Sequence, residues 1–358
     1  MFLRYSKNKY KHKVNKGLPA ICFLAALLFL FSCNENRPER KIERCFYFWK
    51  TVFRLDRSEE AQLSQLNVKT IYVKFFDVDW DEAGHKPLPV AILQNRDYHL
   101  PADIQIIPVV FITNECIRQI DSSQVSLLAQ NLTGLIRSIG NSQHFPGPVP
   151  EIQIDCDWTA STKDNYFALL KTIKQLNNTL ITATIRLHQI KFIAKTGVPP
   201  VDKGLLMCYN MGNSKNPAIK NSILETDELK KYTGNLSAYP LPLDVALPLF
   251  DWKVLFRQNQ YIGLIQNLPD TVFTASFTTK KDNRIEILKD TTVMGYDFSK
   301  GDIIRNEESS YAEIMSTIEE ISKHLKNTHP RVALYHLDSL LLRKYSYHEL
   351  ENVFNGLR

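Results

Sequence analysis

The nine residues 151–159 carry side chains that could do acid–base chemistry. The run Glu151-Ile-Gln-Ile-Asp-Cys-Asp-Trp-Thr159 alternates polar and apolar residues, so Glu151, Gln153, Asp155 and Asp157 share one face of a predicted strand. Carboxylates buried in the middle of a chain need partners, because an unpaired buried charge is costly. Two carboxyl groups at the end of a strand could act as acid and nucleophile in glycoside hydrolysis. We expect Asp155 and Asp157 to be functional and Glu151 and Gln153 to be structural.

Strand and helix patterns alternate on both sides of this run. Predicted strands lie at 45–50, 70–76, 104–112, 151–159, 180–188, 204–211, 244–252 and 331–338, and predicted helices at 58–66, 121–140, 162–177, 227–232 and 311–325. Eight strands with intervening helices predict an α/β fold, a (β/α)8 barrel of the TIM type. An open, doubly wound sheet is the alternative, but no glycine-rich fingerprint follows the first strand.

The segment 261–302 fits neither pattern. It predicts an antiparallel β insertion between strands 7 and 8, with its own strands at 261–264, 271–277 and 286–293. The remainder of 44–358 shows no linker, low-complexity run or break in composition. We therefore expect one barrel domain over 44–358 that contains this insertion.

Polar and aromatic residues gather at the C-terminal ends of the predicted strands, where the active sites of barrels lie. The candidates for substrate contact are Trp49, Asp79, Trp80, Trp158, Arg186, His188, Tyr209, Asn210, Asp251, Trp252 and Asp338. All four tryptophans of the chain belong to this set. Flat aromatic faces beside carboxylates suit sugar rings, so a glycan or oligosaccharide is the expected partner. Lys74 and Arg186 are expected to pair with the carboxylates of the fourth strand.

Two of these strands carry a family resemblance. The chain resembles the chitinase-like glycoside hydrolase family 18 barrels, whose fourth-strand motif Asp-x-x-Asp-x-Asp-x-Glu falls on Ile152, Asp155, Asp157 and Thr159. The sixth strand, Met207-Cys-Tyr-Asn210, is similar to the family's Met-x-Tyr-Asp. In that family the glutamate is the general acid, and Thr159 cannot protonate a leaving oxygen. More closely, the chain resembles an uncharacterised family of bacterial (β/α)8-barrel lipoproteins to which no reaction is assigned.

Two classes of function remain open. The first is a glycosidase with Asp157 as its central catalytic group, held by Asp155. Its acid would come from Glu115, Asp79, Asp251 or Asp338, and Glu115 is preferred as the only glutamate at a neighbouring strand end. In this mechanism Arg186 and His188 orient substrate hydroxyls, and Tyr209 stabilises positive charge. The second is a non-catalytic glycan-binding or envelope-structural lipoprotein. No His-x-His or His-Glu-x-x-His spacing is present, so neither a metal nor a cofactor is expected.

The N-terminus has the layout of a bacterial lipoprotein signal peptide. Basic residues precede a short apolar stretch that ends in Leu30-Phe-Ser-Cys33, which looks like a lipobox. We expect 1–33 to be the signal peptide, Cys33 to be lipidated, for example with palmitate, and 34–43 to be a tether. An uncleaved anchor helix is the alternative. Asn34 favours the outer membrane, so the domain is expected in the bacterial cell envelope, outside the cytoplasm.

The net charge argues against a nucleic-acid partner. The chain has 44 Lys and Arg against 38 Asp and Glu, and six of the bases precede Cys33. Without those six the protein is neutral, so the basic pI belongs to the targeting segment. Cys45, Cys116, Cys156 and Cys208 have no metal-ligand spacing and are expected to be buried as small hydrophobic residues.

Overall fold

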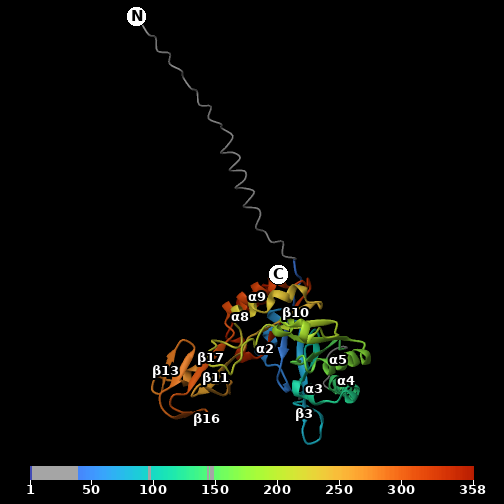
Figure 1. The fold of residues 1–358 in the computed structure, drawn as a ribbon, viewed down its shortest axis with the longest axis horizontal. Coiled ribbons are helices and arrows are strands. Elements are labelled where there is room, and N and C mark those ends of the chain that lie inside the picture. The colour runs from blue at the N-terminus through green and yellow to red at the C-terminus, as the bar shows by residue number, and fades with distance from the viewer. Residues whose placement is uncertain (2–38, 96–97, 143–144, 146–148) are drawn as a thin grey trace. The chain divides into compact units, whose positions relative to one another are not determined.

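A closed barrel of eight parallel strands organises the structure, a computed structural model that describes Met1 and residues 39–95, 98–142, 145 and 149–358 (Figure 1). The barrel strands are β1 (Glu43–Phe48), β3 (Thr70–Asp81), β6 (Gln105–Ile112), β7 (Glu151–Asp155), β8 (Leu180–Arg186), β9 (Lys203–Met207), β10 (Leu243–Pro248) and β18 (Arg331–Tyr335). Each pairs in parallel with the next, and β18 closes the ring onto β1. The predicted (β/α)8 barrel is confirmed, and every predicted barrel strand overlaps an observed one.

Helices follow most of the strands. They are α2 (Arg57–Gln65), α3 (Asn114–Gln119), α4 (Val125–Ser142), α5 (Lys163–Leu176), α6 (Leu187–Lys191), α7 (Ile193–Thr196), α8 (Thr226–Lys230), α9 (Tyr311–His324), α10 (Ser339–Leu342) and α11 (Tyr347–Asn355). Their apolar residues recur at helical spacing: α4 buries Leu128, Leu132, Ile136 and Ile139. Asp56 starts α2 by accepting hydrogen bonds from the Ser58 and Glu59 amides.

A hairpin replaces the helix after the second barrel strand. β3 continues past the barrel and pairs antiparallel with β4 (Lys86–Val90), and the short strands β2 (Val52–Phe53) and β5 (Gln94–Asn95) pair beside it. The prediction that this strand ends at residue 76 is therefore wrong, because its pairing with β4 continues the ladder to Asp81. Asp79 and Trp80 lie in this extension.

The insertion between β10 and β18 is an antiparallel sheet with its own hydrophobic core. Its strands are β11 (Asp251–Arg257), β12 (Gln260–Ile265), β13 (Thr278–Lys281), β14 (Arg284–Ile287), β15 (Thr291–Val293), β16 (Tyr296–Phe298) and β17 (Ile303–Glu308), shown in orange in Figure 1. Five of them form one sheet in the order β12-β11-β17-β14-β13. Leu255, Ile285 and Ile304 belong to its core.

Three predictions about this region need correction. The sheet runs from Asp251 to Glu308, which is wider than the predicted 261–302. No strand forms over 271–277, where a 3-10 turn, η3 (Asp270–Val272), begins instead. The seventh barrel strand ends at Pro248 and not at 252, because the chain from Asp251 onward pairs antiparallel with β17. Asp251 and Trp252 therefore belong to the insertion.

Ion pairs and hydrogen bonds neutralise the polar interior of the barrel. Glu151 is 1% exposed, forms an ion pair with Arg331 and accepts a hydrogen bond from Thr182 at 2.7 Å. Gln153 is fully buried and accepts a hydrogen bond from Tyr47 at 2.5 Å. Both side chains lie deep in the barrel, as the structural role predicted for them requires.

The predicted signal peptide with its lipobox Cys33, and most of the tether, lie outside the described residues. The described part of the tether starts at Glu39, and Arg40 is buried there. Its guanidinium donates to the carbonyls of Ser322 and Leu325 near the end of α9 and to that of Leu357. Within the described part of the chain, no helix is long and apolar enough to cross a bilayer. The four cysteines expected to be buried are buried and free.

The Glu151–Arg331 pair provides a test of the barrel interior. We expect Arg331→Ala to lower the free energy of unfolding by about 3–5 kcal/mol, because it leaves the Glu151 carboxylate buried without its cation. Urea unfolding of wild type and variant measures this difference. The double variant Glu151→Gln, Arg331→Met removes both charges and should recover most of the loss. A double variant as unstable as Arg331→Ala would contradict the explanation.

Candidate functional site

A cleft of about 600 Å³ lies at the C-terminal ends of the barrel strands. Eight of the residues predicted for the site line it: Trp49, Asp155, Arg186, Tyr209, Asn210, Asp251, Trp252 and Asp338. The barrel brings them together because parallel strands all end on the same face. Asp77 and His336 also line the cleft and stand at predicted strand ends, but they are not among the candidate site residues, and the sequence did not point to Phe250 and Tyr335. Each lies close to a strand end, which is the signal that could have identified them.

Aromatic side chains form a continuous wall along the cleft. Ring centroids lie 5.6 Å apart between Trp49 and Tyr335, and 5.4 Å apart between Tyr335 and Tyr209. The series continues from Tyr209 to Phe250 at 5.9 Å and from Phe250 to Trp252 at 5.2 Å. Such edge-to-face and tilted contacts stabilise the rings against one another. The wall therefore offers preorganised apolar faces next to polar groups.

Asp155 is the buried carboxyl of the cleft. Its side chain is 3% exposed and accepts a hydrogen bond from the Thr184 hydroxyl at 2.5 Å. It forms no ion pair with any described residue. Burial raises its pKa from the ordinary 3.8 to about 6, against the opposing charge of Arg186. Asp155 can thus hold a proton closer to neutral pH than an ordinary carboxyl group does.

Asp157 points into a smaller adjoining pocket of about 290 Å³, which His188 and Thr159 also line. Arg186 lines both pockets and forms the predicted ion pair with Asp157 through two of its nitrogens. His188 belongs to the first turn of α6 and not to the fifth strand, which ends at Arg186. Thr159 is in the loop before α5, where its hydroxyl lies 2.9 Å from that of Ser161.

Lys74 does not pair with the fourth strand as predicted. Its ammonium lies 2.8 Å from Asp77 of the same strand and 5.5 Å from the centroid of the Trp49 ring. Residues three apart on a regular strand face opposite sides, but the register of β3 shifts between Lys74 and Phe76. This irregularity brings Asp77 to the side of Lys74.

The other carboxylates that line the cleft also have cationic partners. Asp338 lies 2.9 Å from the Lys50 ammonium, and Asp251 lies 2.5 Å from that of Lys344. Together with the Asp77–Lys74 pair, this leaves Asp155 as the one lining carboxyl without a cationic partner among the described residues. The charge of the cleft is therefore largely neutralised before any ligand binds.

Four candidate residues line neither the cleft nor the adjoining pocket. Glu115 is in the first turn of α3, paired with Arg118 and hydrogen-bonded by Gln119 at 2.7 Å, because helical spacing offers these nearer partners. Asp79 and Trp80 lie on the β3–β4 extension, where Asp79 accepts from Thr113 at 2.9 Å. Trp158 is fully buried, stacks on Tyr166 and donates to the Thr196 carbonyl at 3.0 Å. Trp158 therefore belongs to the hydrophobic core and not to the rim of the cleft, because β7 already ends at Asp155.

Three polar atoms of cleft residues are buried and have no hydrogen-bond partner in the described part of the chain. They are Oδ1 of Asp77, the hydroxyl of Tyr209 and Nδ1 of His336. Buried polar atoms are normally satisfied. The residues that carry these atoms line the cleft, although the atoms themselves are buried.

Comparison with solved structures identifies the fold. The chain superposes on a chitinase from Chromobacterium violaceum with a TM-score of 0.50 and 10% identity, over 87% of this chain and 99% of that one. It superposes on the spore cortex-lytic enzymes SleL of Bacillus cereus and Bacillus megaterium with TM-scores of 0.51 and 0.50, each with 12% identity over 89% of this chain and 74% of theirs. The chain therefore shares the barrel fold of these proteins. No protein-family model and no curated sequence matches the chain.

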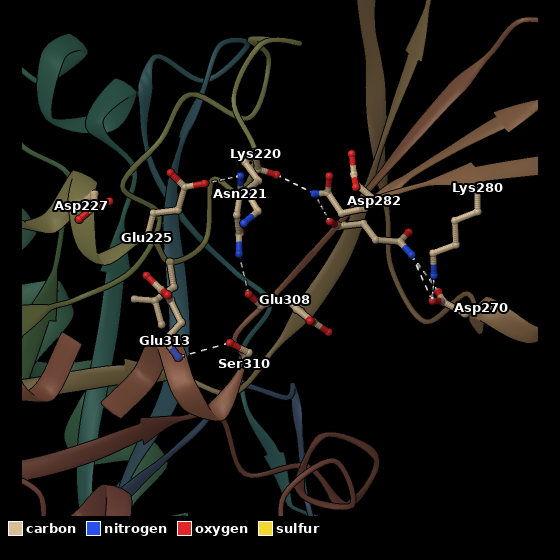
Figure 2. A pocket seen from close by; sticks show the side chains of 13 residues that line it. Lys220, Asn221, Glu225, Asp227, Asp270, Lys280, Asp282, Glu308, Ser310 and Glu313 are labelled. Carbon is tan, nitrogen blue, oxygen red and sulfur yellow. Dashed lines mark hydrogen bonds and ion pairs between the residues drawn. The ribbon is translucent and has the colours of Figure 1, made fainter. Parts of the chain in front are cut away.

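A second groove, of about 540 Å³, lies between the β9–α8 loop and the insertion sheet (Figure 2). Two hydrogen bonds cross it: Asn221 donates to the Glu308 carbonyl at 2.7 Å, and Asn283 donates to the Lys220 carbonyl at 2.8 Å. The groove is mainly acidic, has no aromatic side chain in its lining and contains none of the predicted site residues. Across the described ranges, no cluster of three or more His, Cys, Asp or Glu could hold a metal ion. The aromatic cleft is therefore the candidate site.

The raised pKa of Asp155 predicts how stability depends on pH. A carboxyl with a higher pKa in the folded state binds its proton more tightly when folded, so its contribution to stability falls as pH rises from about 4 to about 6. Asp155→Asn cannot ionise and still accepts from Thr184. Relative to wild type, the variant should gain about 3 kcal/mol across this range, because each pKa unit corresponds to about 1.36 kcal/mol. Urea unfolding at several pH values measures the gain, and a constant difference would contradict the assignment.

Proposed function

We propose that this protein is a glycan-binding lipoprotein whose glycoside-hydrolase-like barrel binds an oligosaccharide in the aromatic cleft without cleaving it. The observation that carries the proposal is the pairing of the carboxylates. Apart from Asp155, each carboxylate lining the cleft already has a cationic partner, as does Asp157 in the adjoining pocket. A carboxylate held by a neighbouring cation is a poor proton donor, because the cation stabilises its ionised form.

The aromatic wall supports a carbohydrate ligand. Trp49, Tyr335 and Trp252 present apolar faces beside the polar side chains of Asn210 and Arg186 in one cleft. A sugar ring has an apolar face and a polar edge, so it can stack on an aromatic ring while its hydroxyls form hydrogen bonds. Chito-oligosaccharides are the first ligands to test, since a structural neighbour is a chitinase.

The fourth strand supports binding over hydrolysis. Thr159 stands at the position of the catalytic glutamate in the family 18 motif, and its hydroxyl lies 2.9 Å from that of Ser161. A threonine cannot act as a general acid near neutral pH. Glu115, the acid expected from a neighbouring strand end, pairs with Arg118 outside the cleft.

Hydrolysis is the second candidate function, and one observation favours it. Asp155 lines the cleft with a pKa raised to about 6, the property needed in a carboxyl group that donates a proton near neutral pH. In this alternative Asp155 protonates the leaving oxygen. Hydrolysis would then require Asp155 to be ionisable, whereas binding alone would not.

Glycan binding by the full chain, purified in detergent, tests the first proposal. We expect calorimetry to detect binding to one member of a panel of chito-oligosaccharides and cell-wall glycans, with no release of reducing ends. Trp49→Ala should weaken binding about tenfold or more, because it removes a large apolar stacking face. The matched control is Tyr347→Ala, an exposed aromatic on α11 outside the cleft.

The same panel separates the two candidates. Reducing ends released by wild type and lost in Asp155→Asn would favour hydrolysis through Asp155. Equal affinity of wild type and Trp49→Ala would contradict a sugar site on the aromatic wall. Wild-type affinity in both Tyr347→Ala and Asp155→Asn would agree with binding that needs the wall and no acid.

Attachment to the bacterial envelope through Cys33 is a proposal with its own test. The lipobox places a cysteine directly after the apolar stretch of the signal peptide. In a bacterial host fed an alkynyl palmitate analogue, we expect the wild-type chain to incorporate label and to sediment with membranes. Cys33→Ser should lose the label. Unlabelled wild-type chain in the membrane fraction would favour the uncleaved anchor helix instead.

A further inference from the structure

Trp252 stands between two pockets. Its side chain lines the main cleft and also a pocket of about 320 Å³ between the insertion and α10. Asp251, Asn267 and Leu341 line both pockets as well, so the two are adjacent. Of the aromatic wall, Trp252 is the member that the insertion sheet contributes, while Trp49 and Phe250 follow barrel strands.

The register of the insertion sheet places Glu307 directly opposite Trp252. In the antiparallel pairing of β11 with β17, Trp252 faces Glu307 and Val254 faces Arg305. Directly opposed residues on such a pair lie close enough for their side chains to interact. Glu307 Oε2 accepts a hydrogen bond from the indole Nε1 of Trp252 at 2.7 Å.

Glu307 is itself held in place by buried partners. Its Oε1 lies 2.6 Å from Nε of Arg305, and both side chains are fully buried. Arg305 donates to the carbonyls of Ser214 at 2.8 Å and Asn216 at 2.7 Å, in the loop that follows β9. Ser222, from the same loop, donates to Glu307 Oε2. The carboxylate is therefore fixed between the insertion and a loop of the barrel.

We propose that Glu307 is a positioning residue for glycan binding: it holds the Trp252 indole so that its ring forms the insertion side of the cleft. This inference rests on the proposed glycan-binding function. Its physical basis is that the two carboxylate oxygens have different partners: Oε1 accepts from Arg305, and Oε2 accepts from Trp252. A buried hydrogen bond to a charged acceptor is stronger than one between neutral groups, so the indole loses most of its rotational freedom before a ligand arrives.

The variant Glu307→Gln tests the separate roles of the two carboxylate oxygens. A glutamine has one carbonyl oxygen, and the Arg305 guanidinium is the stronger competitor for it, so an NH₂ group faces the indole N–H. We expect glycan affinity to fall about tenfold. We also expect the Trp252 indole N–H resonance to move upfield in ¹⁵N-tryptophan spectra of the full chain in detergent, because it loses a charged acceptor.

Two further variants keep the test decisive. Glu307→Asp retains the charge that Arg305 needs but has a shorter side chain, so it should weaken binding even if Glu307→Gln fails to fold. Ser222→Ala removes one donor to the same oxygen but leaves the acceptor of the indole in place, so its loss of affinity should be clearly smaller than that of Glu307→Gln. A loss in Ser222→Ala equal to that in Glu307→Gln would assign the effect to docking of the loop and overturn the positioning role.

The readouts distinguish this inference from the proposed function. An unmoved Trp252 resonance in Glu307→Gln overturns the inference whether or not a glycan is found. Wild-type affinity in Glu307→Gln and Glu307→Asp overturns it while leaving the proposed function intact. Absence of glycan binding by the wild-type chain overturns the proposed function and, with it, this role of Glu307.

Discussion

A carboxylate removed from water must be paired with a cation, hydrogen-bonded or protonated, and this constraint organises the barrel from its interior to its cleft. Deep in the barrel Glu151 depends on Arg331, and at the strand ends Asp77 and Asp157 depend on Lys74 and Arg186. Asp155 lies between the deep interior of the barrel and its strand ends, and it has no cationic partner among the described residues. Its burial is instead relieved by a hydrogen bond from Thr184 and by a raised pKa.

This pattern of pairing is the basis on which we propose binding and not hydrolysis. Hydrolysis needs one carboxyl that keeps its proton and another group that attacks or activates water. In this cleft one carboxyl has a raised pKa, and the others are paired with lysine or arginine. The rings of the aromatic wall pack on one another, and charged groups contact the wall at its two ends, where Lys74 lies against Trp49 and Glu307 accepts from Trp252. The proposed recognition of a sugar therefore requires no general acid at Thr159.

The insertion adds one face of the cleft and is joined to the barrel by buried charge. Arg305 and Glu307 are both fully buried, and their partners come from the loop after β9 as well as from β11. A pair of this kind contributes little net stability by itself, but it specifies one arrangement of the surrounding groups. Here that arrangement includes the orientation of Trp252.

The sequence predicted which helices and strands form better than it predicted the residues at which they end. All eight barrel strands were recognisable because apolar runs with β-branched residues alternate with amphipathic helices, a local signal. Strand ends depend on pairing partners, which explains the errors: β3 gains Asp79 and Trp80 through the β4 hairpin, and β10 stops at Pro248. Where a strand end was predicted wrongly, a candidate residue proved to lie in a different part of the structure. Trp158 became core when β7 ended at Asp155, and Trp252 became part of the insertion.

By itself, the sequence determined the fold class, the face of the barrel that carries the candidate site and eight of the residues that line it. These follow from periodicity along the chain and from the rule that parallel strands end together. Only the tertiary structure decided which carboxylates are paired, that Asp155 is the exception, and that Glu307 holds Trp252. Those facts depend on side chains far apart in the sequence meeting at distances of a few ångströms. Local pattern carries no information about such distances, and they determine the free energy of each buried charge.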